Sequence, residues 1–345
     1  MRNIFVSVTG QDDNLGDSVL RREMLKRLRG RDVRLHLHTG DNTAGYLENV
    51  VDYTVDSTYR SRKVWYTKMV ACKPSSVDIV LNPGERNLMR GQSYLGRYQG
   101  ALFGNLVARG AQLIQTGVGI RNPGETSGME SYAVLKKFRL VAWRDSLSRD
   151  AAAIGRVCPD WALSYASQRP NFVPKTNRKF LAIALRGDRP APAAEWIKQV
   201  ELVCQHTNLT PIVVVQVKRD HEVANQIAEA LSCEITRPWI DSDHAEQEKI
   251  VREVYAKSAA VVSDRLHALI FGITEGAIPI AWSPNSTEKC VRTLASAGFP
   301  NPKIASDLEP LGEVERMLKG FAETQKSLNN AKRELDLLVD TLNER

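Results

Sequence analysis

The chain has 345 residues, more than one hydrophobic core usually serves, so we expect two domains. Hydrophobic residues make up 43% and charged residues 25%, as in globular proteins, and no run approaches the roughly 18 apolar residues of a membrane-spanning helix. The net charge of +7 arises in the first half, because residues 1–170 hold 25 Lys and Arg against 16 Asp and Glu, while the remainder holds 22 against 24. This bias predicts either an anionic partner or a merely basic surface.

The first half alternates apolar strands with helical stretches. The opening NIFVSV fits a strand better than a signal peptide. Further strands are predicted at DVRLHLHTG (32–40), VDIVLNPGE (77–85), AQLIQTGVGI (111–120) and RLVAWRD (139–145), and helices at SVLRREMLKRL (18–28) and YLGRYQGALFGNLVARG (94–110). This alternation implies a parallel sheet with helices on both faces.

The polar segment 164–179 contains two prolines and no periodicity, so we interpret it as a linker. The alternation then resumes, with strands predicted at 180–188, 211–217, 260–264 and 278–284 and helices at 193–207, 221–231, 244–258 and 265–276. The predicted fold class is α/β, with two Rossmann-like domains facing across a cleft (GT-B-like). The predicted boundaries are 1–165, linker 166–178, 179–325 and a C-terminal amphipathic helix 326–345.

The C-terminal segment carries one apolar stripe at helical spacing, formed by Leu328, Ala331, Leu335, Leu338 and Leu342. Such a stripe either docks on its own chain or forms the seam of a coiled-coil homodimer.

Two glycine-containing loops follow strands of the first half. In NLGD (14–17), Gly16 allows a tight turn and Asp17 or Ser18 can cap the next helix, whose free N–H groups would suit an anion. Without a Walker lysine or GxGxxG, the stretch could equally be an ordinary strand–turn–helix joint. In TGVGI, Gly117 and Gly119 either admit a ligand to the backbone or belong to a plain glycine-rich loop.

Charged side chains follow several predicted strands. Arg144 and Asp145 lie in AWRDSLSRD, where Asp145 could instead cap a helix and leave Arg144 exposed. Arg186 ends the strand FLAIALRGD and is expected to point into the cleft. Lys289 follows IPIAWSP and is either a pocket cation or a surface lysine.

The stretch SDRLHALIFG (263–272) places an arginine and a histidine in an apolar run. If Asp264 ends a strand and caps a helix, Arg265, Leu266 and His267 form the first helical turn, whose N–H groups favour anions. An arginine fork suits a carboxylate or phosphate, and a histidine can donate a hydrogen bond or move a proton. The alternative is a core histidine beside a structural ion pair.

Other residue patterns argue against metal and disulfide chemistry. The five cysteines are dispersed with no CxxC pair, which favours a reducing cytoplasm over a disulfide framework or zinc site. His36 and His38 share a strand face but lack a third ligand, so we expect no metal. No GxSxG, HExxH or paired-carboxylate motif occurs.

Taken in order, these stretches resemble the polysaccharide pyruvyl transferase family. The resemblance rests on NLGD, GVGI, WRDSLS, CPDWAL (158–163) and SDRLHALIFGITEGAIPIAW with Lys289 beyond it, and covers most of the chain from residue 4 to about residue 290. RDxxS and RLH are the most specific of these motifs. The family's commoner GNxGD-like form has a glycine before the asparagine, whereas this chain has Asp13 before Asn14.

The resemblance implies a pyruvyltransferase that moves pyruvate from phosphoenolpyruvate to a sugar of a polysaccharide or glycolipid precursor, commonly as a ketal, without a cofactor. It implies that Arg265 and His267 grip phosphoenolpyruvate, that Leu266 contributes its backbone, and that Arg144 and Lys289 also bind substrate. Arg186 fits a further donor-binding arginine.

Within that resemblance, His267 is the candidate general acid, and Asp17 and Asp145 are candidates for the base. Gly16 and Gly117 are expected to lie against substrate. The implied partners are phosphoenolpyruvate and a saccharide acceptor that could be lipid-linked, and no nucleic acid. The implied location is the cytoplasm, with peripheral association at the inner membrane face as one expectation.

Two other functions fit the same architecture. A nucleotide-sugar glycosyltransferase would use similar arginines and a helix N-terminus for a diphosphate. A non-catalytic scaffold in polysaccharide assembly would use the basic face and the C-terminal helix.

Overall fold

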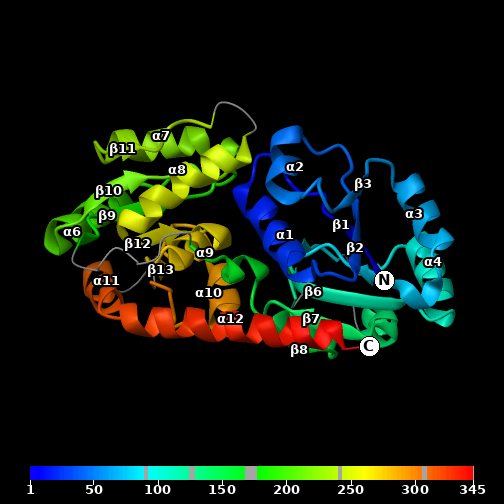
Figure 1. Ribbon diagram of the computed structural model, residues 1–345. Helices are drawn as coiled ribbons and strands as arrows, with labels where there is room; N and C mark the ends of the chain where they lie inside the picture. Colours follow the sequence, from blue (N-terminus) through cyan, green and yellow to red (C-terminus); the bar gives the residue numbers. More distant parts are fainter. Residues whose placement is uncertain (89–91, 124–128, 168–176, 240–242, 305–308, 345) are drawn as a thin grey trace. The chain divides into compact units, whose positions relative to one another are not determined.

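The computed structural model describes residues 1–88, 92–123, 129–167, 177–239, 243–304 and 309–344 (Figure 1). The chain forms two compact units. Unit 1 comprises Met1–Gln11, Asp17–Trp161 and Glu334–Arg345, and unit 2 comprises Asp12–Gly16 and Ala162–Arg333. The division after Trp161 lies close to the predicted boundary at 165, and most of the predicted linker falls outside the described residues.

Unit 1 is built on a parallel sheet with strand order β3-β2-β1-β4-β6-β7-β8, and β5 pairs with the end of β6. All four residues of β4 and of β7 are buried, as expected for a parallel sheet covered on both faces. The strands are β1 (Arg2–Ser7), β2 (Val33–His38), β3 (Ser57–Tyr59), β4 (Val77–Val80), β5 (Gly84–Arg86), β6 (Gln112–Ile120), β7 (Leu140–Trp143) and β8 (Arg156–Val157). The α-helices that begin in this part of the chain are α1 (Leu15–Leu28), α2 (Ala44–Val50), α3 (Arg62–Ala71), α4 (Arg97–Ala108) and α5 (Ser146–Ala152).

The centre of this sheet contains a bulge at Gly117. Gln115 pairs with Val141 and Val118 with Trp143, so β6 has one residue more than β7 between these pairs. Gly117 absorbs the extra residue with φ of +65°, a conformation that favours glycine. The space beside its Cα is taken by the indole of Trp161: a Cβ at position 117 would lie 2.7 Å from Trp161 Cδ1.

Unit 2 repeats the architecture on a smaller parallel sheet with order β11-β10-β9-β12-β13. Strand β12 is buried at all six residues, and α9, which follows it, is almost entirely buried because its sequence is apolar on every side. The strands are β9 (Phe180–Ala184), β10 (Thr210–Val213), β11 (Glu234–Ile235), β12 (Ser258–Ser263) and β13 (Ile278–Ile280). The α-helices are α6 (Ala194–Thr207), α7 (His221–Ala230), α8 (His244–Lys257), α9 (Leu266–Thr274), α10 (Glu288–Ser296), α11 (Pro310–Leu318) and α12 (Phe321–Asn343). Short 3-10 helices complete the two units at η1 (Pro74–Ser76), η2 (Met129–Lys137), η3 (Trp161–Ser164) and η5 (Lys218–Asp220).

The long helix α12, drawn in orange to red in Figure 1, begins in unit 2 and ends in unit 1. The five residues of its apolar stripe are each at most 1% exposed, so the expectation of docking on its own chain is confirmed. A homodimer through this helix would therefore need a face other than the stripe. Among the described residues, no helix is both long and apolar enough to cross a membrane.

We expect acid to weaken unit 1 through His36. Its ring is buried and bonded to the Tyr59 hydroxyl (2.9 Å) and Asn3 Oδ1 (3.1 Å). Burial, with the nearby charges of Lys68 and Arg34, lowers the pKa of His36 to about 4. Between about pH 6.5 and pH 4 the unfolded chain therefore binds a proton at this histidine that the folded chain does not bind. The free energy of unfolding consequently decreases as the pH is lowered through this window.

The expected contribution of His36 to the loss of stability between pH 7 and pH 5 is about 1–2 kcal/mol, and urea unfolding should show a pH dependence smaller by this amount in His36→Gln. His206→Gln, at an exposed position of α6, is the matched control and should leave the pH dependence unchanged. An identical pH dependence in wild type and His36→Gln would contradict the assignment.

Candidate functional site

The centre of the candidate site in unit 2 is an ion pair between Arg265 and Asp220. Arg265 follows β12, and Asp220 ends η5 in the loop after β10, so both lie at the carboxyl edge of the sheet. Arg265 donates from Nε and Nη2 to the two carboxylate oxygens of Asp220, and both side chains are largely buried. Asp220 Oδ1 also accepts from the N–H of Gly187 (2.7 Å). Burial raises the pKa of Asp220, and the charge and hydrogen bond of Arg265 oppose that rise.

The prediction that Asp264 caps α9 is wrong. Arg265 is the N-cap residue, and the buried carboxylate of Asp264 instead accepts from the N–H of Arg186 (3.0 Å) and from Ser283 Oγ (3.3 Å). Burial raises the pKa of Asp264. Ser263 pairs with Ala184 across β12 and β9, so the residues that follow the two strands leave the sheet side by side. Asp264 thus fixes the loop that carries Arg186 next to the start of α9.

The side chain of Arg186 pairs with a different carboxylate. Its Nε and Nη2 donate to Asp188 Oδ1 (2.8 Å) and Oδ2 (2.5 Å). This hydrogen bonding lowers the pKa of Asp188 to about 2, so the pair stays charged at neutral pH. The guanidinium groups of Arg186 and Arg265 are therefore each held by a carboxylate along the edge that carries Nε and Nη2. Within the described parts of the chain, no hydrogen bond engages Nη1 of Arg265, which suits it to an anion.

The NLGD loop belongs to this same site. Lys218 N donates to Asp13 O (2.8 Å), Asn14 forms a β-bridge with Val217, and Arg219 pairs with Asp13, so Asp12–Gly16 cluster with unit 2 rather than unit 1. Gly16 then lies directly against His267: a Cβ at position 16 would be 2.3 Å from His267 Nδ1 and 2.6 Å from its Cβ. The structure therefore brings together two residues of the predicted site that are far apart in sequence.

Two further predicted residues lie on helices that begin at this edge of unit 2. Leu266 is the buried first residue of α9, a nine-residue helix with its N-terminus at this edge. Lys289 is half-buried in the first turn of α10. No group of three or more His, Cys, Asp or Glu side chains in the described ranges is placed to hold a metal ion.

A second cluster surrounds Arg144 in unit 1. The alternative of an exposed Arg144 is wrong, because the residue is 1% exposed at the end of β7. Its Nη2 lies 3.6 Å from Glu85 Oε1 and its Nη1 3.8 Å from Asp160 Oδ2. Among the residues that the structure describes, none hydrogen-bonds its Nε or Nη2. A buried guanidinium with donors to spare is suited to an anionic or hydroxyl-rich ligand.

Three other predicted residues of unit 1 have mainly structural surroundings. Asp145 is the buried N-cap of α5 and accepts from Ser148 N (2.8 Å) and Oγ (2.9 Å). The space that Gly117 leaves is filled by Trp161, so this glycine serves packing and admits no ligand there. Asp17 is partly exposed in the first turn of α1, accepts from Gln11 N (2.9 Å) and lies 3.5 Å from Arg21.

The sequence did not single out the carboxylates of the two clusters. Asp220 and Asp160 follow a strand after a short loop, and Glu85 lies in the short strand β5 that comes after β4. Because charged side chains at the carboxyl ends of parallel strands share one edge of the sheet, that position was the available signal.

The comparisons with known proteins give one family. A sequence model described as polysaccharide pyruvyl transferase matches residues 14–281. No curated protein matches the chain significantly.

Solved structures share the architecture of the chain at low sequence identity. The UDP-GlcNAc 2-epimerase of Neisseria meningitidis bound to UDP-GlcNAc matches with TM-score 0.56 and 9% identity, covering 100% of both chains. A putative UDP-N-acetylglucosamine 2-epimerase of Listeria monocytogenes matches with TM-score 0.55 and 10% identity, covering 100% of this chain and 97% of that one. A glycosyltransferase of Rickettsia africae matches with TM-score 0.54 and 10% identity, covering 100% and 99%. These likenesses establish the α/β fold of the GT-B class with Rossmann-like units.

Proposed function

Since the chain belongs to the polysaccharide pyruvyl transferase family, we propose that it transfers pyruvate from phosphoenolpyruvate to a sugar of a polysaccharide or glycolipid precursor, forming a ketal. The observation that carries the proposal is the placement of Arg186 and Arg265 at the carboxyl ends of β9 and β12, with His267 in the first turn of α9. Phosphoenolpyruvate carries a phosphate and a carboxylate on one small molecule, so its site requires several fixed cations, and this edge of the sheet carries two arginines.

The donor would bind at the start of α9. Its phosphate would take the free Nη1 of Arg265 and the N–H groups of the first helical turn, where the helix dipole also favours an anion. Arg186 and Lys289 would hold the carboxylate. Asp220 and Asp188 keep the two guanidinium groups oriented before the donor arrives, which reduces the cost of ordering them on binding.

In the proposed reaction, a proton adds to C3 of phosphoenolpyruvate and C2 acquires oxocarbenium character. One sugar hydroxyl attacks C2, the C2–O bond to phosphate breaks, and a second hydroxyl closes the ketal. The two hydroxyls lose two protons, of which one balances the proton gained at C3 and the other leaves with phosphate. His267 would supply the proton or donate to the departing phosphate, and the arginines would stabilise its charge.

The acceptor would bind on unit 1, which carries Arg144 of the RDxxS motif and the basic excess. Asp17 is a better candidate base than Asp145, because Asp145 is buried and committed to capping α5. We place the protein in the cytoplasm.

The direct test incubates the protein with phosphoenolpyruvate and candidate glycans, lipid-linked ones included. We expect release of inorganic phosphate together with a glycan mass increased by one pyruvyl ketal. Thermal stabilisation by a UDP-sugar, with none by phosphoenolpyruvate, would instead favour a nucleotide-sugar glycosyltransferase. Stabilisation by neither ligand, with no product, would favour a scaffold.

Gly16→Ala is expected to lower kcat/KM for phosphoenolpyruvate by about 100-fold. The added Cβ would overlap the ring and Cβ of His267, so the imidazole or the Asp12–Gly16 loop must shift, and a displacement of about 1 Å near reacting atoms can cost this much. The measurement is steady-state phosphate release with a saccharide acceptor.

Gly312→Ala in α11 is the matched control, because a Cβ there meets nothing within 4 Å, and it should retain wild-type rates. If the effect acts through His267, adding Gly16→Ala to His267→Ala should cost little more. Full activity of Gly16→Ala would refute the role of His267.

A further inference from the structure

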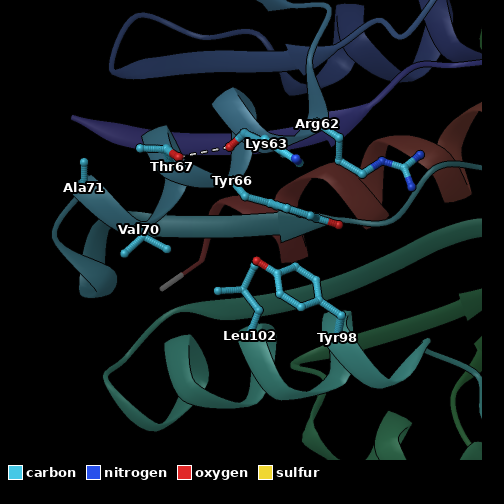
Figure 2. Close-up of a pocket in the computed structure, with 8 residues that line it drawn as sticks. All are labelled: Arg62, Lys63, Tyr66, Thr67, Val70, Ala71, Tyr98 and Leu102. Carbon is cyan, nitrogen blue, oxygen red and sulfur yellow. Dashed lines mark hydrogen bonds between the residues drawn. The ribbon is translucent and has the colours of Figure 1, made fainter.

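An apolar groove lies between α3 and α4 on unit 1, outside the site described above. Its cavity of about 910 Å³ is lined by Tyr66, Val70, Tyr98 and Leu102, with Arg62 and Lys63 on the α3 side (Figure 2). The rings of Tyr66 and Tyr98 approach to 5.8 Å between centroids. Tyr66 is buried and anchored by Gln99, whereas Tyr98 is 67% exposed.

The rim of the groove is also apolar. Val70, which is 46% exposed, and Tyr98 line the groove, and Val64, which is 56% exposed, is a further exposed apolar residue of α3. Single exposed hydrophobic residues are common, but exposed apolar side chains that line a groove together indicate an interaction surface.

The two helices that form this groove carry basic residues and no acidic ones. Residues 57–77 and 86–124 contain no Asp or Glu. The exposed basic side chains on and next to the two helices are Arg60, Arg62, Lys63, Lys68, Lys73, Arg97 and Arg109. Arg60 pairs with Asp41, and in the described parts of the chain no carboxylate lies within ion-pair distance of the other six. Burial is the main cause of the lowered pKa values of His36 and His38, and the charges of Lys68 and Arg62 add to it, while Asp41 opposes the shift at His38.

We propose that this α3–α4 face, defined by Arg62, Lys63, Val64, Val70 and Tyr98, binds the surface of a membrane containing anionic lipids. The basic side chains are spread over two helices rather than gathered around one point, so they match an extended negative surface better than a single phosphate. Lys and Arg can reach the headgroups while the valines and Tyr98 enter the interface, where tyrosine is favoured. The open groove would receive lipid chains. This surface is independent of the proposed reaction.

The test is co-sedimentation of the full chain with vesicles of phosphatidylcholine, alone or mixed with phosphatidylglycerol. Wild type should bind the anionic vesicles, bind the neutral ones weakly, and dissociate as salt is raised. Arg62→Gln with Lys63→Gln should weaken binding to anionic vesicles about 30-fold, because each basic residue near the surface contributes about fivefold to the affinity. Val64→Ser with Tyr98→Ser should also weaken binding and leave less protein bound at high salt.

The matched control is Lys198→Gln with Leu202→Ser on α6, which also removes one basic and one apolar exposed side chain and should leave binding unchanged. All variants change exposed positions, so circular dichroism and melting temperature should match wild type. Equal binding to neutral and anionic vesicles, or an equal loss in the α6 variant, would overturn the proposal. The proposal would also be overturned if the protein did not bind vesicles and instead self-associated through Tyr98.

Discussion

Arg265→Ala is expected to lower kcat/KM for phosphoenolpyruvate by about 1000-fold, the upper range for loss of one fixed group that stabilises developing charge. The variant removes a cation at the start of α9 and with it the donor that faces the proposed phosphate. Arg265→Lys should recover little of this, because an ammonium cannot hold both oxygens of Asp220 and still present a separate N–H to the ligand. Phosphate release in the presence of acceptor measures both variants.

Stability must be separated from catalysis in this experiment, since Arg265→Ala also leaves Asp220 buried without its partner. Burial raises the pKa of Asp220, so the variant should be least stable at high pH, where the folded chain must keep the carboxylate charged. Arg237→Ala, which breaks an exposed pair with Glu246, is the control and should keep wild-type activity. A folded Arg265→Ala variant with normal phosphoenolpyruvate affinity would remove the basis of the proposed donor site.

Much of the fold could be predicted because buried parallel strands are short apolar runs. The stretch AVVSD became β12, and the apolar run after Arg265 became α9. The helix α3 was missed although Trp65, Tyr66 and Met69 form its buried face, because polar and basic residues surround them in the sequence. That omission also hid the groove between α3 and α4.

The candidate site was predictable in its residues but not in their contacts. Arg265, His267, Arg186 and Gly16 could be selected because each follows a strand. The packing of Gly16 against His267 depends on the loop Asp12–Gly16 pairing with residues 216–219, which no local pattern encodes. The sequence also does not show which carboxylate pairs with which arginine, because residues such as Arg265 and Asp220 meet only when their strands lie side by side in the folded sheet.

Gly117→Ala is expected to destabilise unit 1 by about 2–4 kcal/mol. Alanine at φ of +65° costs about 1–2 kcal/mol, and its Cβ would lie 2.7 Å from Trp161 Cδ1. The indole cannot easily move away, because it is fully buried and Nε1 donates to Thr116 Oγ1 (3.0 Å). Urea unfolding of the variant and wild type measures the difference.

Two comparisons separate backbone strain from overlap. Gly298 has φ of +78° and no atom within 4 Å of a built Cβ, so Gly298→Ala should show the conformational cost alone, about 1–2 kcal/mol. In a Trp161→Leu background, Gly117→Ala should lose its overlap cost and approach the same value, giving a coupling energy of about 1–2 kcal/mol. Additive effects of the two substitutions would mean that Trp161 does not limit position 117, and that the bulge in β6 is required by its backbone conformation alone.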